Sequence, residues 1–412
     1  MAGPQARSRS RPINRGVAPH DSSFLAATGG GSAAPRRSRL ARVHAQPHRP
    51  HRGVAVNTAL STLCALPGVE RAWPRDDGAI IFEQKDDGRL RAGRIGPHGS
   101  AELLPYASDP ALPELSPSLP GRLVVHRMGR RAVVVGPGKV IKLVRPGRAQ
   151  AIAEKTRATA QVFSRYGLRG ANVISSSAAN VVFTFLPGIS LRTAGDDARK
   201  AWHQFCDAWP NMAAHTDLAG LTAHTGRDEA AVLHRWFSWA QAFNVLPELP
   251  RLGRAVAQVC DALQHNGDPL VFSHRDLHDG QILWDGSTLG ILDVDTAAAG
   301  EAALDLANLR AHVELGALMS SSLPHPHIGS SRLPSSAPSQ GSAESSSYTP
   351  ALAAAVLDML NNAVARSAVT SVRFDAYLRA ARLRLAFVHA FRPPAQAWLP
   401  EWIDRYLRDD HR

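Results

Sequence analysis

The stretch SHRDLHDGQILWDG, residues 273–286, concentrates polar side chains in a chain whose charged residues make up 20% of the total. His274, Arg275 and Asp276 stand together, and Gln281 follows Asp276 by five positions. Asp293 comes next, within the mostly apolar run GILDVD. A carboxylate can accept a proton from an attacking hydroxyl, and carboxylate and amide oxygens are ligands that suit Mg²⁺. The spacing therefore predicts metal-assisted chemistry on a phosphate group.

The same residues match the spacing of the kinase catalytic loop, H-R-D-x-x-x-x-N, except that Gln281 replaces the final asparagine. In this interpretation Asp276 is the catalytic base, while Gln281 and Asp293 bind Mg²⁺. Asp295 either approaches the metal or caps a turn. Asp305 is expected to accept hydrogen bonds from the backbone of the loop, which is a structural role.

The N-terminal half supplies the remaining parts of such a site. Lys142, in the β-branched run GKVIKLV, is expected to contact the α- and β-phosphates, although it could instead face solvent. Glu154, in the following helical segment, is placed to pair with Lys142, and an exposed pair with the neighbouring lysine is the rival interpretation. The turn containing Gly129 occupies the position of the phosphate-covering loop, but it lacks a glycine-rich triplet. Phe185 lies in the expected hinge strand, whose backbone would bind adenine.

From these motifs the sequence resembles the aminoglycoside phosphotransferase-like branch of the kinase fold, which includes choline kinases and maltokinases. The hinge FLPG and the segment ILDVDTAAAGEAALDLANL, residues 291–309, carry the resemblance most clearly. Two positions depart from the usual pattern, because Arg275 stands where this branch often has glycine and Gln281 where kinases have asparagine. The resemblance covers about 120–412 and implies phosphoryl transfer from ATP, with Mg²⁺, to a hydroxyl of a small molecule. A long regulatory segment of the kind found in protein kinases has no room after Asp293.

Hydrophobic spacing indicates which elements position these residues. Before residue 190 the spacing predicts a short helix at 56–66 followed by three short strands, then a strand meander at 122–147, a helix at 148–167 and two further strands. Helical spacing dominates after residue 190. We therefore expect an α+β, bilobal protein-kinase-like fold, with an antiparallel-sheet N-lobe, a mainly helical C-lobe and a small N-terminal α+β accessory module. The predicted segments are a disordered basic tail at 1–52, the accessory module at 53–118, the N-lobe at 119–188, and the C-lobe at 189–412 with a disordered Ser/Pro-rich insertion at 320–350.

Composition limits the surroundings in which the chain works. The formal net charge is +12, and much of the excess precedes residue 53. This tail could touch nucleic acid, but it has no aromatic residues interleaved with its arginines, so nucleic acid is an unexpected partner except through the tail. The three cysteines have no metal-ligand spacing and are predicted to be buried free thiols. With no apolar run long enough for a membrane span, we expect a cytoplasmic protein without a membrane partner.

The leading hypothesis is an enzyme, an ATP- and Mg²⁺-dependent kinase for a hydroxyl of a sugar, an amino alcohol or an aminoglycoside-like compound. A catalytically weak, nucleotide-binding protein of the same fold is the alternative, motivated by the single glycine of the phosphate loop and by Gln281. The net positive charge argues mildly against a polycationic aminoglycoside.

Overall fold

The computed structural model describes residues 57–322 and 346–407. The predicted tail at 1–52 and most of the predicted insertion at 320–350 lie outside the described residues. Within the described ranges the chain is a mixture of helices and mainly antiparallel sheets, so the predicted α+β class is confirmed. No helix in these ranges has the length and apolar character needed to cross a bilayer.

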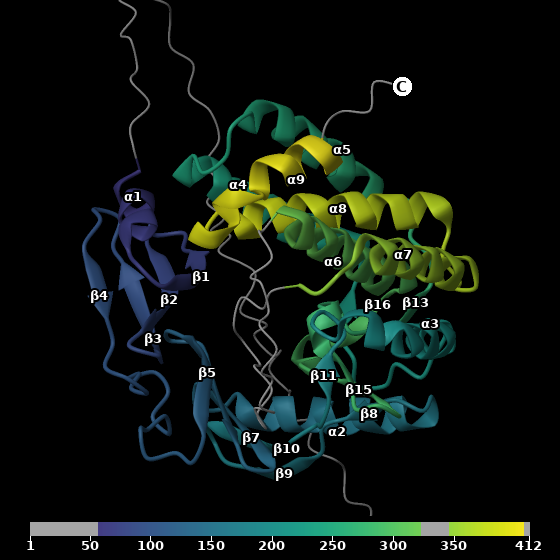
Figure 1. The fold of residues 1–412 in the computed structure, drawn as a ribbon, viewed down its shortest axis with the longest axis horizontal. Coiled ribbons are helices and arrows are strands. Elements are labelled where there is room, and N and C mark those ends of the chain that lie inside the picture. The colour runs from purple at the N-terminus through teal and green to yellow at the C-terminus, as the bar shows by residue number, and fades with distance from the viewer. Residues whose placement is uncertain (1–56, 323–345, 408–412) are drawn as a thin grey trace, which may run out of the picture. The chain divides into compact units, whose positions relative to one another are not determined.

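The first elements form a small sheet covered by one helix (Figure 1). The predicted helix near residues 56–66 and the three predicted strands are present, and a short fourth strand was missed. Asn57 caps the helix by accepting a hydrogen bond from the Leu60 amide. The elements are α1 (Thr58–Ala65), β1 (Val69–Pro74), β2 (Ile80–Asp86), β3 (Arg89–Ile95) and β4 (Ala101–Leu103).

A second sheet, in the order β5-β6-β7-β10-β9, carries Lys142 on its central strand. Helix α2 packs on this sheet through Ala149, Ala153 and neighbouring apolar residues, and this agrees with the predicted meander followed by a helix. The elements are β5 (Arg122–Arg127), β6 (Arg131–Gly136), β7 (Lys139–Val144), α2 (Ala149–Arg165), β9 (Val173–Ser176) and β10 (Asn180–Thr184).

Two further small sheets fix the catalytic loop to its surroundings. One has the order β11-β14-β15-β8, and the other β12-β16-β13. Strand β8 comes from the first half of the chain and pairs in parallel with β15, which precedes Asp293. The strands are β8 (Arg169–Gly170), β11 (Ile189–Ser190), β12 (Ala223–His224), β13 (Leu270–Ser273), β14 (Ile282–Trp284), β15 (Leu289–Ile291) and β16 (Ala298–Glu301).

The second half is mainly helical, as the spacing predicted. Helix α4 begins with a reciprocal pair of hydrogen bonds between Thr225 and Asp228. Thr349 caps the start of α7, and Thr370 caps the start of α8. The helices are α3 (Arg199–Ala213), α4 (Gly226–Phe243), α5 (Leu249–Gln264), α6 (Ala302–Ser322), α7 (Pro350–Ala365), α8 (Ser371–His389) and α9 (Leu399–Tyr406).

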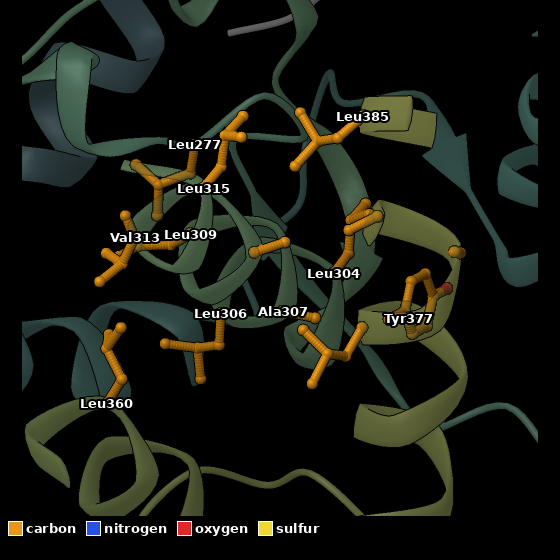
Figure 2. Packing of buried hydrophobic residues seen from close by; sticks show 14 of the residues in the cluster. Leu277, Leu304, Leu306, Ala307, Leu309, Val313, Leu315, Leu360, Tyr377 and Leu385 are labelled. Carbon is orange, nitrogen blue, oxygen red and sulfur yellow. The ribbon is translucent and has the colours of Figure 1, made fainter. Parts of the chain in front are cut away.

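Helix α6 is the centre of the largest hydrophobic core (Figure 2). Its side chains are buried on nearly every face, and Figure 2 shows them meeting Leu277 of the catalytic loop, Leu360 of α7 and Tyr377 of α8. Cys206 and Cys260 are buried as predicted, whereas Cys64 is exposed. Because Leu277 directly follows Asp276, burial of this leucine ties the catalytic loop to the core.

The predicted insertion is shorter than expected at both ends. Helix α6 continues to Ser322, and Tyr348 is buried with its hydroxyl donating to Asp279 over 3.1 Å. The Ser/Pro composition of the stretch concealed this contact, which depends on the one aromatic residue near its end.

The first sheet packs directly against the helical half. Phe243 and Phe391 join Ala59, Leu63, Ile80 and other residues of α1 to β3 in one apolar cluster. The indole of Trp239 also donates to Asp76 in the β1–β2 turn over 2.8 Å. The accessory elements therefore share a core with α4 and with the residues just after α8.

Candidate functional site

The catalytic loop leaves strand β13 and is held at its backbone by α6. The carboxylate of Asp305 accepts hydrogen bonds from the amides of His274 and Arg275 over 2.7 and 2.8 Å, as predicted. His274 donates through Nε2 to the carbonyl of Leu292 over 2.7 Å, which joins the loop to the strand before Asp293. Arg275 has φ 69°, a left-handed conformation that glycine adopts without strain, and glycine is common there in the branch that the sequence resembles.

Asp276 is partly buried beside this loop, and its carboxylate makes no hydrogen bond within the described residues. Burial raises the pKa of Asp276; the positive charge of Arg384 opposes this rise, and the negative charge of Asp293 adds to it. A carboxylate of raised proton affinity, without a protein partner, is suited to accept a proton from a bound hydroxyl.

Lys142 joins the two lobes through a buried ion pair. Its Nζ lies 2.7 Å from Oδ1 of Asp293 and 2.5 Å from Oδ2 of Asp295. Arg131, at the start of β6, approaches Asp293 over 3.5 Å. Burial alone would raise the pKa of Asp293, but the charges of Lys142 and Arg131 outweigh it, so the pKa lies well below its usual value. The structure therefore brings together two of the predicted site residues and adds Asp295 and Arg131 to them.

The predicted pairing of Lys142 with Glu154 is wrong in this structure. Glu154 is exposed on α2 and accepts a hydrogen bond from Gln150, whereas Lys142 pairs with Asp293 and Asp295. The next residue, Lys155, points toward the site and donates to the carbonyls of Asp295 and Ala297 over 3.0 and 2.9 Å. The helix is thus rotated by about one residue relative to the expected register, because its buried face is set by Ala149, Ala153, Thr156, Thr159 and Phe163.

Gln281 directly precedes the hairpin of β14 and β15, and its side chain is buried. With its amide oriented to suit its neighbours, the nitrogen donates to the carbonyls of Asp276 and Leu292, and the oxygen accepts from His278 Nε2, all over 3.2 Å. An amide oxygen can accept two bonds, so one lone pair remains for a ligand. Gln281 is close to the predicted metal residues in sequence and in the fold, and its role as a ligand stays a prediction.

The two predicted nucleotide contacts have partners of their own. Gly129 has φ 66° in the β5–β6 turn, and its amide donates to Asp109 over 2.7 Å. The amide of Phe185 donates to the carbonyl of Gly138 over 3.1 Å. Burial would raise the pKa of Asp109, but hydrogen bonds from His126 and from the amides of Gly129 and Ala111 lower it overall. Asp109 thus anchors the turn. It lies in the Pro-rich stretch at 109–121, whose composition gives no sign of this role.

A second polar cluster lies next to the catalytic loop. Arg192 donates to Asp279 over 2.6 and 3.0 Å and approaches His312 Nδ1 over 3.3 Å. The rings of His278 and His312 stack with centroids 4.8 Å apart. Ligand atoms of His278, Asp279 and His312 all lie within 4.8 Å of one another, as in a metal site. However, the guanidinium of Arg192 already neutralises Asp279, and it would repel a metal ion there.

The oxygen ligands around Asp293 suit a hard divalent cation. Asp293, Asp295 and Gln281 offer carboxylate and amide oxygens, the ligand set that Mg²⁺ prefers. In the described structure Lys142 pairs with both carboxylates, and Arg131 approaches Asp293 as a second positive charge. The residues present therefore fit Mg²⁺ in composition.

Comparison with known proteins agrees with this arrangement. The model of the phosphotransferase enzyme family matches residues 129–319, the range that contains the turn of Gly129, the catalytic loop and α6. The predicted resemblance is therefore confirmed over these residues, and the predicted kinase-like fold class agrees with it. No curated protein sequence matches the chain.

Solved structures of several phosphotransferases resemble the chain at low identity. A glucosamine kinase is 21% identical, with 86% of this chain and 98% of that chain covered and a TM-score of 0.44. A macrolide 2'-phosphotransferase from Brachybacterium faecium is 15% identical, with 72% and 91% covered and a TM-score of 0.39. An aminoglycoside phosphotransferase from Streptomyces rimosus is 18% identical, with 63% and 91% covered and a TM-score of 0.41. We base the function on the family match and on the site geometry.

Proposed function

We propose that the chain transfers the γ-phosphate of ATP to a hydroxyl of a small polar molecule, since residues 129–319 match the model of the phosphotransferase enzyme family. The observation that carries this proposal is the meeting of Lys142 with Asp293 and Asp295, next to a carboxylate at Asp276 that has no hydrogen bond within the described residues. A family match alone would leave open whether these parts stand together.

In the proposed reaction, Asp276 orients the acceptor hydroxyl and takes its proton. The hydroxyl oxygen forms a bond to the γ-phosphorus while the bond from that phosphorus to the β–γ bridging oxygen breaks, and ADP leaves with the electron pair. Lys142 donates to the α- and β-phosphates, and Arg131 adds a second positive charge on the same side. Such a transfer depends mainly on positioning and on charge neutralisation.

Backbone groups near Phe185 would bind the adenine ring, and the turn at Gly129 would cover the phosphates. Asp293 and Gln281 would hold Mg²⁺, with Asp295 close by. When bound, Mg²⁺ supplies charge neutralisation of the phosphate oxygens. Lys142 pairs with both carboxylates, and the nearer of them in its effect, Asp293, acts electrostatically on Asp276.

The test is the variant Asp276→Asn in the full-length chain. We expect transfer from Mg-ATP to fall by about 10²–10⁴-fold, because the amide cannot take the hydroxyl proton. Product formation across a panel of sugars, amino alcohols and aminoglycosides measures this, and a nucleotide-dependent rise in Tm checks that the fold and nucleotide binding persist. The matched control is Asp261→Asn, at an exposed position of α5.

Undiminished turnover in Asp276→Asn would remove this assignment. A wild-type chain that binds nucleotide but phosphorylates no acceptor would instead favour the alternative, a catalytically weak nucleotide-binding protein.

A further inference from the structure

Arg392 follows helix α8, and its guanidinium makes no ion pair within the described residues. The residue is partly exposed, but its Nε is buried without a hydrogen-bond partner, and its Nη1 lies 3.4 Å from Nε2 of His389. A guanidinium keeps its proton, so this buried N–H stays unsatisfied until an acceptor such as an anion binds to it.

Other cations surround this guanidinium. Arg71 of β1 and Arg192 both act on it electrostatically, and burial together with their charges lowers the pKa of Arg392 to about 10. Burial, with the charges of Arg392 and Arg192, also holds the pKa of His389 well below its usual range, and an imidazole supplies no negative charge that could balance the arginine. The positive potential of the region is therefore a property of several elements.

The acidic groups of this region are already engaged. Glu83 pairs with Arg71 over 2.6 Å, and Asp279 pairs with Arg192 over 2.6 Å. Glu229 accepts from His224 over 3.1 Å and stands 3.6 Å from Arg384 Nε, an atom that is itself buried without a hydrogen bond. The carboxylate that remains near Arg392 is Asp276, which must stay available for the reaction.

We propose that the hydroxyl acceptor is anionic, and that its carboxylate or phosphate group binds Arg392 and Arg384 beside Asp276. This inference rests on the proposed function and names the substrate class of the same site. Hydrogen bonds link Arg384 to the catalytic loop, because Arg384 donates to Asn308 and Asn308 donates to the carbonyl of Leu277, next to Asp276. Arg392 also interacts electrostatically with Asp276. A guanidinium binds a carboxylate or phosphate through two parallel hydrogen bonds, which would also satisfy the buried Nε atoms.

The nucleotide itself is a poor occupant for Arg392. Lys142 and Arg131 are the cations that contact Asp293, where the phosphates of ATP would bind. Arg392 and Arg384 make no ion pair with Asp293 or Asp295 among the described residues, and both act electrostatically on Asp276, as Arg131 also does. The cations that contact Asp293 are therefore assigned to the nucleotide, and Arg392 and Arg384 to the acceptor.

The first experiment compares acceptors of similar size and different charge with full-length protein and Mg-ATP. The probes are glucose, glucosamine, gluconate and glucose 6-phosphate, with formation of ADP and of the phosphorylated product as readouts. We expect kcat/KM to be at least tenfold higher for one or both anionic acceptors than for glucose, and lowest for glucosamine. The comparison of gluconate with glucose 6-phosphate distinguishes a carboxylate site from a phosphate site.

The second experiment removes the charge at Arg392. In Arg392→Gln we expect kcat/KM for the preferred anionic acceptor to fall about ten- to hundredfold, with the change mainly in KM, while the KM for ATP is unchanged. The Tm of the variant without ligand should not fall, because Arg392 makes no ion pair within the described residues and the substitution removes its unsatisfied, buried Nε–H. Arg379→Gln is the matched control, since Arg379 is exposed on α8 and bonds to Gln258.

Equal or better use of glucose or glucosamine would overturn the proposal, as would an Arg392→Gln variant that keeps its preference or that loses affinity for ATP instead. If no acceptor is phosphorylated, calorimetric titration of the four compounds into Asp276→Asn with a non-hydrolysable ATP analogue decides the question separately. Binding of an anion, lost in Arg392→Gln, then supports the charge preference while the proposed transfer fails, and no anion binding overturns it.

Discussion

Arg384 links the acceptor side of the site to the proton affinity of Asp276. Its guanidinium donates to Asn308 Oδ1 over 2.6 Å, and Asn308 in turn donates to the carbonyl of Leu277, next to Asp276. Burial raises the pKa of Asp276, and Arg384 limits that rise. The proposed base must be ionised to accept a proton, so the rate should decline as the pH falls through this raised pKa.

Replacing Arg384 with glutamine should therefore move the acid limb of kcat/KM to higher pH. The shift is to higher pH because the loss of a nearby positive charge favours the protonated, neutral form of Asp276 and so raises its pKa further. A pH–rate profile between about pH 4 and pH 8 measures the change, with Arg379→Gln as the control variant. An acid limb that stays in place in Arg384→Gln would show that another group limits the rate.

Residues that stand in a motif could be predicted from the sequence, whereas residues whose role depends on how the elements pack could not. Asp276, Asp293 and Lys142 stand in short, recognisable motifs, and their predicted neighbourhood is the one found for Lys142 and Asp293. Helical spacing gives the period of a helix but leaves its rotation uncertain by one residue, so it does not show that Glu154 faces solvent and Lys155 faces the site. Arg392 carries no motif, and its significance appears only when the engagement of the surrounding carboxylates is known.

At the scale of elements, Arg373 fastens helix α8 to its neighbours. It donates to both oxygens of Glu301 over 2.7 Å, and to the carbonyls of Ala262, Leu263 and His265 at the end of α5. Tyr377 donates to the same carboxylate over 3.0 Å. Glu301 closes β16, the strand that pairs with β13 before the catalytic loop. This buried network thus positions the strand from which the loop departs.

We expect Arg373→Met to lower the free energy of unfolding by about 3–5 kcal/mol, because it leaves Glu301 buried without its cation and three carbonyls without their donor. Chemical denaturation measures the loss, and Arg379→Met on the exposed side of the same helix is the control. A change below about 1 kcal/mol would mean that the network contributes geometry and little stability.

At the scale of the whole molecule, the accessory elements and the helical half share apolar contacts. The rings of Phe243 and Phe391 meet edge to face, with centroids 5.4 Å apart, inside the cluster that also holds Phe82 and Ile80. Alternation of apolar residues predicted the strands of the accessory sheet, but it carries no information about which distant helix covers them. The predicted separate module therefore has a core completed by residues more than 100 positions away.

Phe391→Ala should destabilise the protein by about 3–5 kcal/mol, as expected for a fully buried phenylalanine. Because this ring packs against both the accessory elements and the helical half, we expect a single unfolding transition at lower temperature. Activity should be lost over the same temperature range. Calorimetry measures this, and Val372→Ala, at an exposed position, is the control. Early melting of residues 57–103 alone, detected by hydrogen exchange, would indicate a module that is stable independently of this core.

The pairing of Lys142 with Asp293 also bears on the timing of folding. These residues stand 151 positions apart in the sequence. Strand β8 likewise pairs with the later strand β15, where Arg169 lies opposite Gly290. A ribosome adds about 5–20 residues per second, so the N-terminal partners are made on the order of ten seconds before the hairpin that completes them. Through that interval Asp293 and Asp295 are not yet available to Lys142, and β15 is not yet available to β8. The proposed nucleotide site therefore cannot form until synthesis has passed Asp295, while the C-terminal helices are still to be made.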